Sequence, residues 1–370
     1  MKRKHAITTL VVVAILAILV YVQFRTWRTF DWAEFWRQTK GVNLWYIAAA
    51  VGLIYFAYVL RAVRWMLFLR PTKHTTISRM IPPQFIGFTA LGLFGRAGEF
   101  ARPYIIARKE GLTLPSQLAV WAVERVFDMS SVAFLVAAFL GLRGGRAAQI
   151  LRQGVHDGLH ALAHKVHSQA LVLVVALAIA AAAAYGVWRL SRKSTGALAE
   201  RLRSFREGLN TIKDIKSLVA IILLSVGMWG AIAEAYLCVV HAYPEAPVNA
   251  ASAEVAHPAR LDRMKTDDVM LMMCASMFGS MVQLPGVGGG SQLAVITVLS
   301  SVFGDEPYNV SHELAVSCGM MLWLVTFMSV IPAGLIMARW EHISVRAVAQ
   351  DSETEVEAES EASPPPEAPK

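Results

Sequence analysis

The sequence predicts an all-α, polytopic integral membrane protein with about six full spans and two re-entrant or broken helical elements. Three observations predict this class. Hydrophobic residues make up 55% of the 370 residues and charged residues only 17%, which is little charge for a soluble protein of this length. The apolar residues gather in runs of about 18 to 25, the length that crosses a hydrocarbon core of about 30 Å. Lys and Arg collect between these runs, as they do in cytoplasmic loops.

The apolar runs define the expected spans. The first follows the basic start Met1–His5, and because no small-residue cleavage pattern follows, we interpret it as an uncleaved anchor. Basic residues after the second and fourth runs indicate that these ends are cytoplasmic, and an even number of crossings then places both termini in the cytoplasm. The expected spans are Ala6–Phe24, Leu44–Leu69, Leu118–Leu142, Ala170–Leu190, Leu218–Val240 and Leu314–Ala338.

Two further apolar regions are too short to cross and are interrupted by prolines or glycines. Met80–Phe94 is expected to dip into the membrane from the cytoplasmic side. Val269–Leu284 and Gln292–Phe303 flank Pro285–Gly290, and we expect two half-helices that enter from the outer side. Such backbone is tolerated at membrane depth where protein covers it. Two broken elements of this kind are typical of transporters with inverted repeats.

The chain is expected to divide into three regions. Residues 1–43 would form an N-terminal anchor span and an outer loop, and residues 44–346 the transmembrane domain. Residues 347–370 are rich in Glu, Ala, Ser and Pro, which predicts a disordered, acidic cytoplasmic tail. The formal net charge is +8 despite this tail, so the membrane body is strongly basic and suits the anionic bacterial inner membrane. No basic module lies outside the membrane segments, so no nucleic-acid partner is expected.

The sequence gives no indication of a cofactor, a metal site or a catalytic residue. Cys238, Cys274 and Cys318 lie in separate apolar runs without metal-ligand spacing or a disulfide framework. Histidines between His156 and His167 have helical spacing, but a solvated amphipathic helix explains them better than a metal face. The sequence does not determine the oligomeric state of the protein.

The first polar motif is Gly95–Pro103. In a helix, Arg96, Glu99 and Arg102 are three apart and share one face, so the carboxylate can order both guanidiniums while donors stay free. Arginine suits a phosphate because its planar fork donates two parallel hydrogen bonds. An interfacial patch of snorkelling side chains is the alternative.

The second motif lies near the start of the third expected span. Glu124 and Asp128 are four apart and Arg125 is three from Asp128, so all can share a face. Charges at this depth are unfavourable unless they are paired or hydrated. The motif is either a salt bridge that joins helices or a functional site, as the wall of a substrate cavity or as a proton relay.

The third motif is the glycine break. Gly288, Gly289 and Gly290 would let backbone amides approach a ligand, and Ser291 is placed to cap the next half-helix, followed by Gln292. The N-terminus of that helix favours an anion, whereas a flexible turn is the alternative. The break is no P-loop, because no Gly-Lys-Ser/Thr ending follows.

One carboxylate stands alone in an expected span. Glu234 is surrounded by apolar residues, so it is expected to be protonated, to face water or to be paired. Arg96, Arg102 and Arg125 are its candidate partners.

These motifs, in this order, give the chain a resemblance to the flippase-like transmembrane family of lysylphosphatidylglycerol synthases of the multiple peptide resistance factor type, in a stand-alone form. The resemblance covers about Leu44 to Ala338. It depends on Gly95-Arg96-Ala97-Gly98-Glu99 with Arg102, Glu124-Arg125 with Asp128, and Leu284-Pro285-Gly286 with Gly288-Gly289-Gly290.

The resemblance implies a bacterial inner-membrane fold that moves aminoacylated or glycosylated lipids between leaflets. Gln292 stands where the family usually has Glu, and Trp323 lies where an Arg is often found. The soluble aminoacyltransferase domain is absent, so the resemblance does not imply catalysis. The expected function is binding and translocation of an anionic, aminoacylated or glycosylated lipid between leaflets, with a separate lipid-modifying enzyme as a possible partner. The alternatives are a membrane-embedded lipid-modifying transferase and an accessory scaffold.

Overall fold

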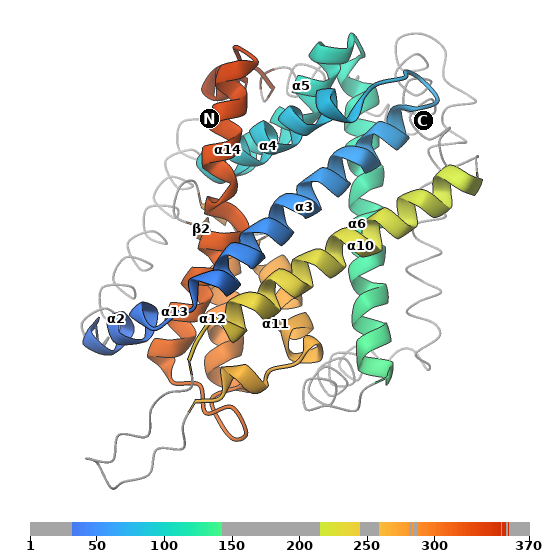
Figure 1. Ribbon diagram of the computed structural model, residues 1–370. Coiled ribbons are helices and arrows are strands. Elements are labelled where there is room, and N and C mark those ends of the chain that lie inside the picture. Colours follow the sequence, from blue (N-terminus) through green and yellow to red (C-terminus); the bar gives the residue numbers. More distant parts are fainter. Residues whose placement is uncertain are drawn as a thin grey trace, which may run out of the picture.

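The computed structural model describes residues 32–142, 215–244, 259–280, 283–284, 288–348, 350–352 and 354. In these ranges the chain is helical apart from one pair of two-residue strands (Figure 1), which confirms the all-α prediction. The spans expected at Ala6–Phe24 and Ala170–Leu190 lie outside the described residues.

The described elements follow in chain order. They are α2 (Trp32–Lys40), α3 (Leu44–Leu69), α4 (Ile77–Phe94), the 3₁₀ segment η1 (Gly95–Phe100), α5 (Ala101–Glu110), α6 (Leu114–Leu142), α10 (Ile215–His241), η3 (Leu261–Arg263), α11 (Thr266–Gly279), β1 (Gln283–Leu284), β2 (Gly288–Gly289), α12 (Gly290–Val302), α13 (His312–Trp323), the π-helical turn η4 (Leu324–Met328) and α14 (Val330–Trp340).

Three described helices are long and apolar enough to cross a membrane. They are α3, α10 and the continuous run from α13 through η4 to α14, at Leu44–Leu69, Ile215–His241 and His312–Trp340. These match three of the expected spans. The third expected span coincides with α6, which is 29 residues long, carries the Glu124–Asp128 motif and is not among the three.

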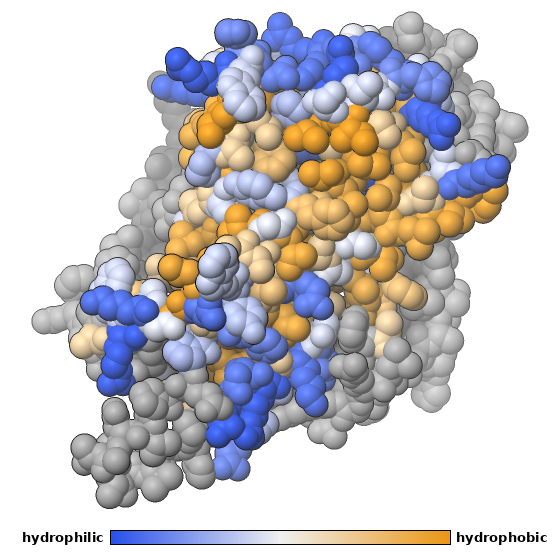
Figure 2. Space-filling view, viewed as in Figure 1, coloured by the Kyte–Doolittle hydropathy of each residue, from blue (hydrophilic) through white to orange (hydrophobic). Residues whose placement is uncertain are grey.

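The surface of the molecule agrees with insertion in a bilayer. Helices α3 and α10 pack along their lengths (Figure 1) and turn large apolar side chains outward. Figure 2 shows hydrophobic residues across the middle of one face and hydrophilic residues at its two ends. Exposed apolar side chains on these helices include Trp45, Phe56, Ile222 and Leu223. An exposed apolar band this wide is unfavourable in water and marks contact with lipid.

The first interrupted region forms a helical hairpin. Helix α4 runs through Pro82 and Pro83, η1 reverses the chain, and α5 packs back against α4. The reversal begins at Gly95, whose φ of 63° is accessible to glycine at little cost. Gly98 lies against the backbone of Ala90, so the two arms touch at the tip. Helix α4 is continuous through Met80–Phe94 and begins three residues earlier, at Ile77; the predicted entry of this region from the cytoplasmic side stays a prediction.

The second interrupted region is also a hairpin. Helices α11 and α12 pack together, and the antiparallel pair β1–β2 closes the tip, with Leu284 opposite Gly288. A Cβ at Gly279 would lie 2.2 Å from the carbonyl oxygen of Gly290, so only glycine permits this approach. The first arm ends at Gly279 rather than at Leu284, because a strand replaces its last turn. Strand β1 contacts η1, so the tips of the two hairpins meet.

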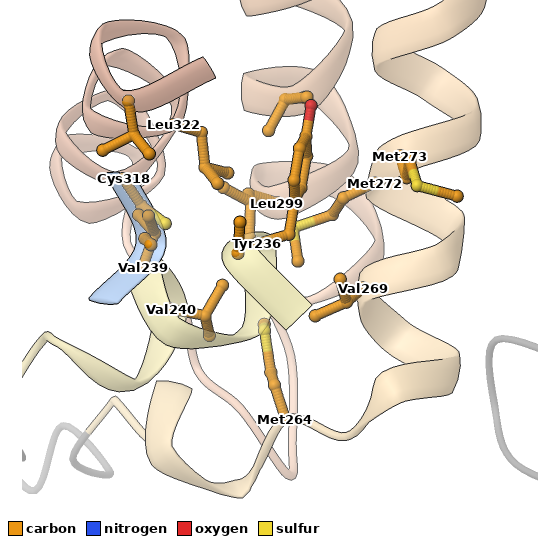
Figure 3. Close-up of a cluster of buried hydrophobic side chains, with 14 of the residues drawn as sticks. Tyr236, Val239, Val240, Met264, Val269, Met272, Met273, Leu299, Cys318 and Leu322 are labelled. Atoms are coloured by element: carbon orange, nitrogen blue, oxygen red, sulfur yellow. The ribbon is translucent and has the colours of Figure 1, made fainter. Parts of the chain in front are cut away.

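The largest apolar core joins the second hairpin to α10 and α13. Figure 3 shows side chains from these four helices directed toward one another. The fully or nearly fully buried members include Tyr236, Val240, Val269, Met272, Leu299, Cys318 and Leu322. Burial of each large apolar side chain stabilises the fold by about 1.5–3 kcal/mol.

The last helix changes its winding halfway along. At η4 the amide of Ser329 donates to the carbonyl of Leu324, five residues back, and Pro332, in the first turn of α14, has no N–H to continue the ladder. The hydroxyl of Tyr55 on α3 donates to the carbonyl of Ser329 at 2.6 Å. Below this turn α13 packs on α12, and above it α14 packs on α4.

Both predicted end regions contain more structure than expected. Helix α2 lies in the expected outer loop, and the hydroxyl groups of Thr39 and Ser317 are 2.9 Å apart. Residues 347–348 and 350–352, in the expected disordered tail, are helical, because Val345 is buried against α4 and α5 and Tyr104 donates to Asp351 at 3.5 Å. Residues 355–370 lie outside the described residues, so disorder there stays a prediction.

Candidate functional site

A buried cluster of charged side chains connects five helices. It draws two arginines from α3, one from α5, and an arginine with two carboxylates from α6, while α4 and α10 supply neutral polar partners. We call the following residues the charge cluster: Arg61, Arg64, Arg102, Glu124, Arg125 and Asp128. Glu124 is ten residues after the start of α6, so it is about 15 Å along that helix.

Arg64 is the centre of the cluster. Its side chain is 1% exposed and bridges both carboxylates of α6, donating to Glu124 Oε1 at 2.6 Å and to Asp128 Oδ1 at 2.7 Å. It also donates to Ser225 Oγ on α10 at 2.8 Å. Glu124 and Asp128 can meet one guanidinium because residues four apart share a helix face. The predicted shared face of these two carboxylates is therefore confirmed.

Arg102 binds the opposite side of the same carboxylate. Its guanidinium forms a bidentate pair with Glu124 and donates to Gln84 Oε1 at 3.0 Å. It also lies 4.6 Å from the ring centroid of Trp65. Two arginines thus neutralise Glu124, whose side chain is 0% exposed, and this pairing offsets the large desolvation of a buried carboxylate.

The remaining cations differ in their partners. Arg125 is partly exposed and pairs with Asp128 Oδ2 at 3.3 Å and Glu124 Oε2 at 3.4 Å. Arg61 is 7% exposed and stacks on Phe88, 4.6 Å from its centroid. Among the described side chains no carboxylate forms an ion pair with Arg61; its guanidinium stacks on aromatic rings, and Asp128 and Glu124 act on it electrostatically from a longer distance.

The cluster contains more cations than anions. Its four guanidiniums face two carboxylates, both already shared between arginines. A positive excess in a water-poor environment is unfavourable unless an anion joins it. The arrangement is therefore suited to binding an anionic group, and Arg61 is the cation whose charge is least compensated.

The motif around Gly95 forms differently from the prediction. Arg102 pairs with Glu124 rather than with Glu99, because the chain changes from η1 to α5 between them. Glu99 is half-buried and acts electrostatically on Arg125. The side chain of Arg96 lies outside what the structure describes.

The glycine break and Glu234 stand apart from the charge cluster. Gly288 and Gly289 pair with β1, so part of their backbone does not face a ligand. Helix α12 begins at Gly290, which places Ser291 inside the first turn rather than at the predicted cap, followed by half-buried Gln292. Glu234 is exposed on α10, and none of its three predicted arginine partners has a recorded ion pair with it in the described part of the chain.

The sequence analysis missed Arg61 and Arg64 as site residues. Both were interpreted only as markers of a cytoplasmic end. Their position could have shown more, because the apolar run Trp65–Leu69 continues the helix beyond them. Two arginines three apart within an apolar helix need partners at that depth.

Ser225 gives a direct test of this geometry. Replacing Ser225 with Ala removes one acceptor from the buried Arg64 guanidinium, and a hydrogen bond to a charged group contributes about 2 kcal/mol. We expect a lower midpoint of thermal unfolding in detergent. Thr297→Ala is the matched control, because Thr297 also bonds to a carbonyl four residues back but is exposed. Equal effects of the two substitutions would contradict the role of Ser225.

Comparison with known families now connects the fold to a class of membrane protein. Residues 9–334 match the family model described as the lysylphosphatidylglycerol synthase TM region. The chain belongs to this family. The match covers the hairpins, the charge cluster, two of the three membrane-spanning helices and most of the third, His312–Trp340, and it confirms the resemblance inferred from the motifs. It also shows a multi-pass membrane protein.

One curated relative and the solved structures were also compared. The chain is 32% identical over 119 residues to a protein named glycosyltransferase AglD from Haloferax volcanii. The alignment covers 30% of this chain and 19% of that relative, so the shared part is a small fraction of the relative. No solved structure matches the chain.

Proposed function

We propose that the protein binds the anionic head group of a membrane lipid in the charge cluster and moves that lipid between the leaflets of the bacterial inner membrane. The positive excess of the buried cluster carries this proposal. Membership of the lysylphosphatidylglycerol synthase transmembrane family supports a role that involves lipids. Both termini lie in the cytoplasm in this proposal, as the distribution of Lys and Arg favours.

Arg61 is the proposed primary contact for the phosphate. The guanidinium fork of Arg102 is occupied by Glu124 and Gln84, whereas Arg61 stacks on aromatic rings and forms no ion pair with a described carboxylate. Arg102, Glu124, Arg125 and Asp128 then hold the site in shape. Glu99 and Glu234, together with Arg96 and the break from Gly288 to Gln292, remain predicted contacts along the lipid path.

The meeting of the hairpin tips supports the transport part of the proposal. The tip at η1 and the strand β1 at the tip of the second hairpin contact each other. A head group that leaves the charge cluster toward the other leaflet would pass this contact. Broken helices that meet near the midplane are the arrangement that many transporters use.

Lipid scrambling in proteoliposomes tests the proposal. With fluorescent phosphatidylglycerol as the probe, Arg61→Gln is expected to lower both binding and the rate of exchange between leaflets by about tenfold, the effect of about 1.4 kcal/mol. Arg70→Gln is the control, because Arg70 ends the same helix and is exposed. Unchanged scrambling and binding in Arg61→Gln would refute the assignment.

The relative named as a glycosyltransferase favours a second candidate function. In it, the protein assists or performs modification of a lipid-linked substrate, alone or with a separate enzyme. Overexpression would then produce a modified lipid in membrane extracts. A translocator instead redistributes existing lipid without a new species in the extract.

A further inference from the structure

We infer that the charge cluster selects a lipid with one phosphodiester charge and otherwise uncharged hydroxyl groups, and that it discriminates against cationic aminoacyl head groups. This inference rests on the proposed function and names the substrate class of the same site. It depends on the sign of the local charge, on the buried polar atoms that have no partner and on the position of Arg61.

The net charge of the site favours a monoanion. Within the charge cluster, four guanidiniums face two carboxylates, and Glu99 adds a third that acts on Arg125. For the described side chains, one positive charge therefore remains. One phosphodiester would neutralise it. A lysyl ester of the same phosphodiester carries two ammonium groups and would increase the positive charge instead.

The carboxylates leave little capacity for an incoming ammonium group. Both oxygens of Glu124 accept hydrogen bonds from arginines. Asp128 accepts from Arg64 at 2.7 Å and from Trp229 at 3.3 Å through Oδ1. Asp128 Oδ2 accepts no hydrogen bond but pairs with the partly exposed Arg125 at 3.3 Å. An ammonium group there would compete with that guanidinium and would add to the positive excess of the site, whereas a hydroxyl group would add no charge.

The buried atoms without a partner fit a hydroxyl group and a phosphate oxygen. Gln84 is 0% exposed, and its Nε2 donates to no recorded acceptor. The Nε atoms of Arg64 and Arg125 are also buried donors without an acceptor, and Asp128 Oδ2 is a buried acceptor without a donor. Three donors suit phosphate oxygens, whereas a hydroxyl can donate to Asp128 and accept from Gln84. Buried polar groups in native proteins are normally satisfied.

The aromatic ring of Phe88 brings the least compensated cation close to these donors. Gln84 and Phe88 are four apart on α4 and so share a face. The guanidiniums of Arg61 and Arg102 lie 4.6 and 5.3 Å from the centroid of Phe88, and Arg102 also donates to Gln84. Phe88 thus places Arg61 in the same part of the charge cluster as Arg102 and Gln84, where both guanidiniums would attract an anion.

Competition in nanodiscs tests the inference with defined lipids. The probes are phosphatidylglycerol, lysylphosphatidylglycerol and phosphatidylcholine, each quantified on the protein by native mass spectrometry. The wild-type protein is expected to retain phosphatidylglycerol at least about tenfold better than the lysyl lipid. Arg61→Glu reverses the local charge, so its preference is expected to shift to the lysyl lipid. Arg70→Glu, on the exposed end of α3, should keep the wild-type preference.

The outcomes separate this inference from the proposed function. Wild-type preference for the lysyl lipid, or none, overturns the substrate class while Arg61-dependent binding still supports the proposed function. Binding that is equal in the wild type and in both Arg61 variants refutes both. If Arg61→Glu does not fold, Arg61→Gln takes its place. That variant is expected to reduce the preference for phosphatidylglycerol over the lysyl lipid relative to the wild-type protein. An unchanged difference in that variant overturns the inference.

Discussion

Replacing Arg64 with Ala is expected to destabilise the protein by about 3–5 kcal/mol, because the change leaves buried carboxylates without their shared cation. Arg64 is 0% exposed and joins α3 to both carboxylates on α6 and to Ser225 on α10. Its loss would leave Asp128 with only the longer contacts to Arg125 and Trp229, both at 3.3 Å. Thermal unfolding in detergent, followed by tryptophan fluorescence, measures the change.

The conservative variant makes this prediction more specific. Arg64→Lys keeps the charge but has no planar fork, so it cannot reach Glu124, Asp128 and Ser225 at once. We expect Arg64→Lys to recover less than half of the lost stability. Arg70→Ala, at the exposed end of the same helix, should change stability by less than about 0.5 kcal/mol. A stable Arg64→Ala protein would show that the network does not join the helices.

The second large effect is expected at the tip of the first hairpin. A Cβ at Gly98 would lie 2.2 Å from the carbonyl carbon and oxygen of Ala90 and 2.5 Å from the amide of Leu91. These are backbone atoms, so no side chain can rotate away. Gly98→Ala is therefore expected to separate η1 from α4 and to destabilise the protein by about 3 kcal/mol, the upper range of overpacking. Protease sensitivity of residues 95–100 in detergent reports the opening.

Two other glycines provide controls for Gly98→Ala. Gly52 and Gly230 lie in α3 and α10, and a Cβ at either position meets nothing within 4 Å. Alanine is expected to leave stability unchanged or to raise it slightly at both, because it is a better helix former than glycine. If Gly98→Ala matched these controls, the close contact at the tip would be excluded.

Much of the fold was predictable because the membrane imposes one-dimensional rules. Apolar length predicted α3 to the residue, and apolar runs too short to span predicted both hairpins. Pro82 and Pro83 lie inside α4 and do not interrupt it, and the chain reverses at Gly95 instead. The shared face of Glu124 and Asp128 followed from helical spacing alone. Each of these features depends on residues that are close in sequence, so the spacing along the chain was enough to predict it.

The site was less predictable because its partners are distant in sequence. Arg64 meets carboxylates 60 and 64 residues away and a serine 161 residues away, and no pattern along the chain encodes such pairings. The charge rule for membrane topology assigned Arg61 and Arg64 to a loop-facing end, which hid their burial. The sequence left three states open for Glu234, protonated, hydrated or paired, and its exposed side chain favours the first two.

The wide turn at η4 has a mechanical consequence for the molecule. A helix resists bending through its regular ladder of hydrogen bonds, and this ladder is interrupted between Leu324 and Pro332. The last span can therefore bend at η4 as two rigid segments. Helix α13 packs against the second hairpin and α14 packs against the first. The hydrogen bond from the Tyr55 hydroxyl on α3 to the carbonyl of Ser329 connects this turn to α3. Each segment can transmit a displacement to the hairpin that it contacts, while α3 holds the turn at η4 in place.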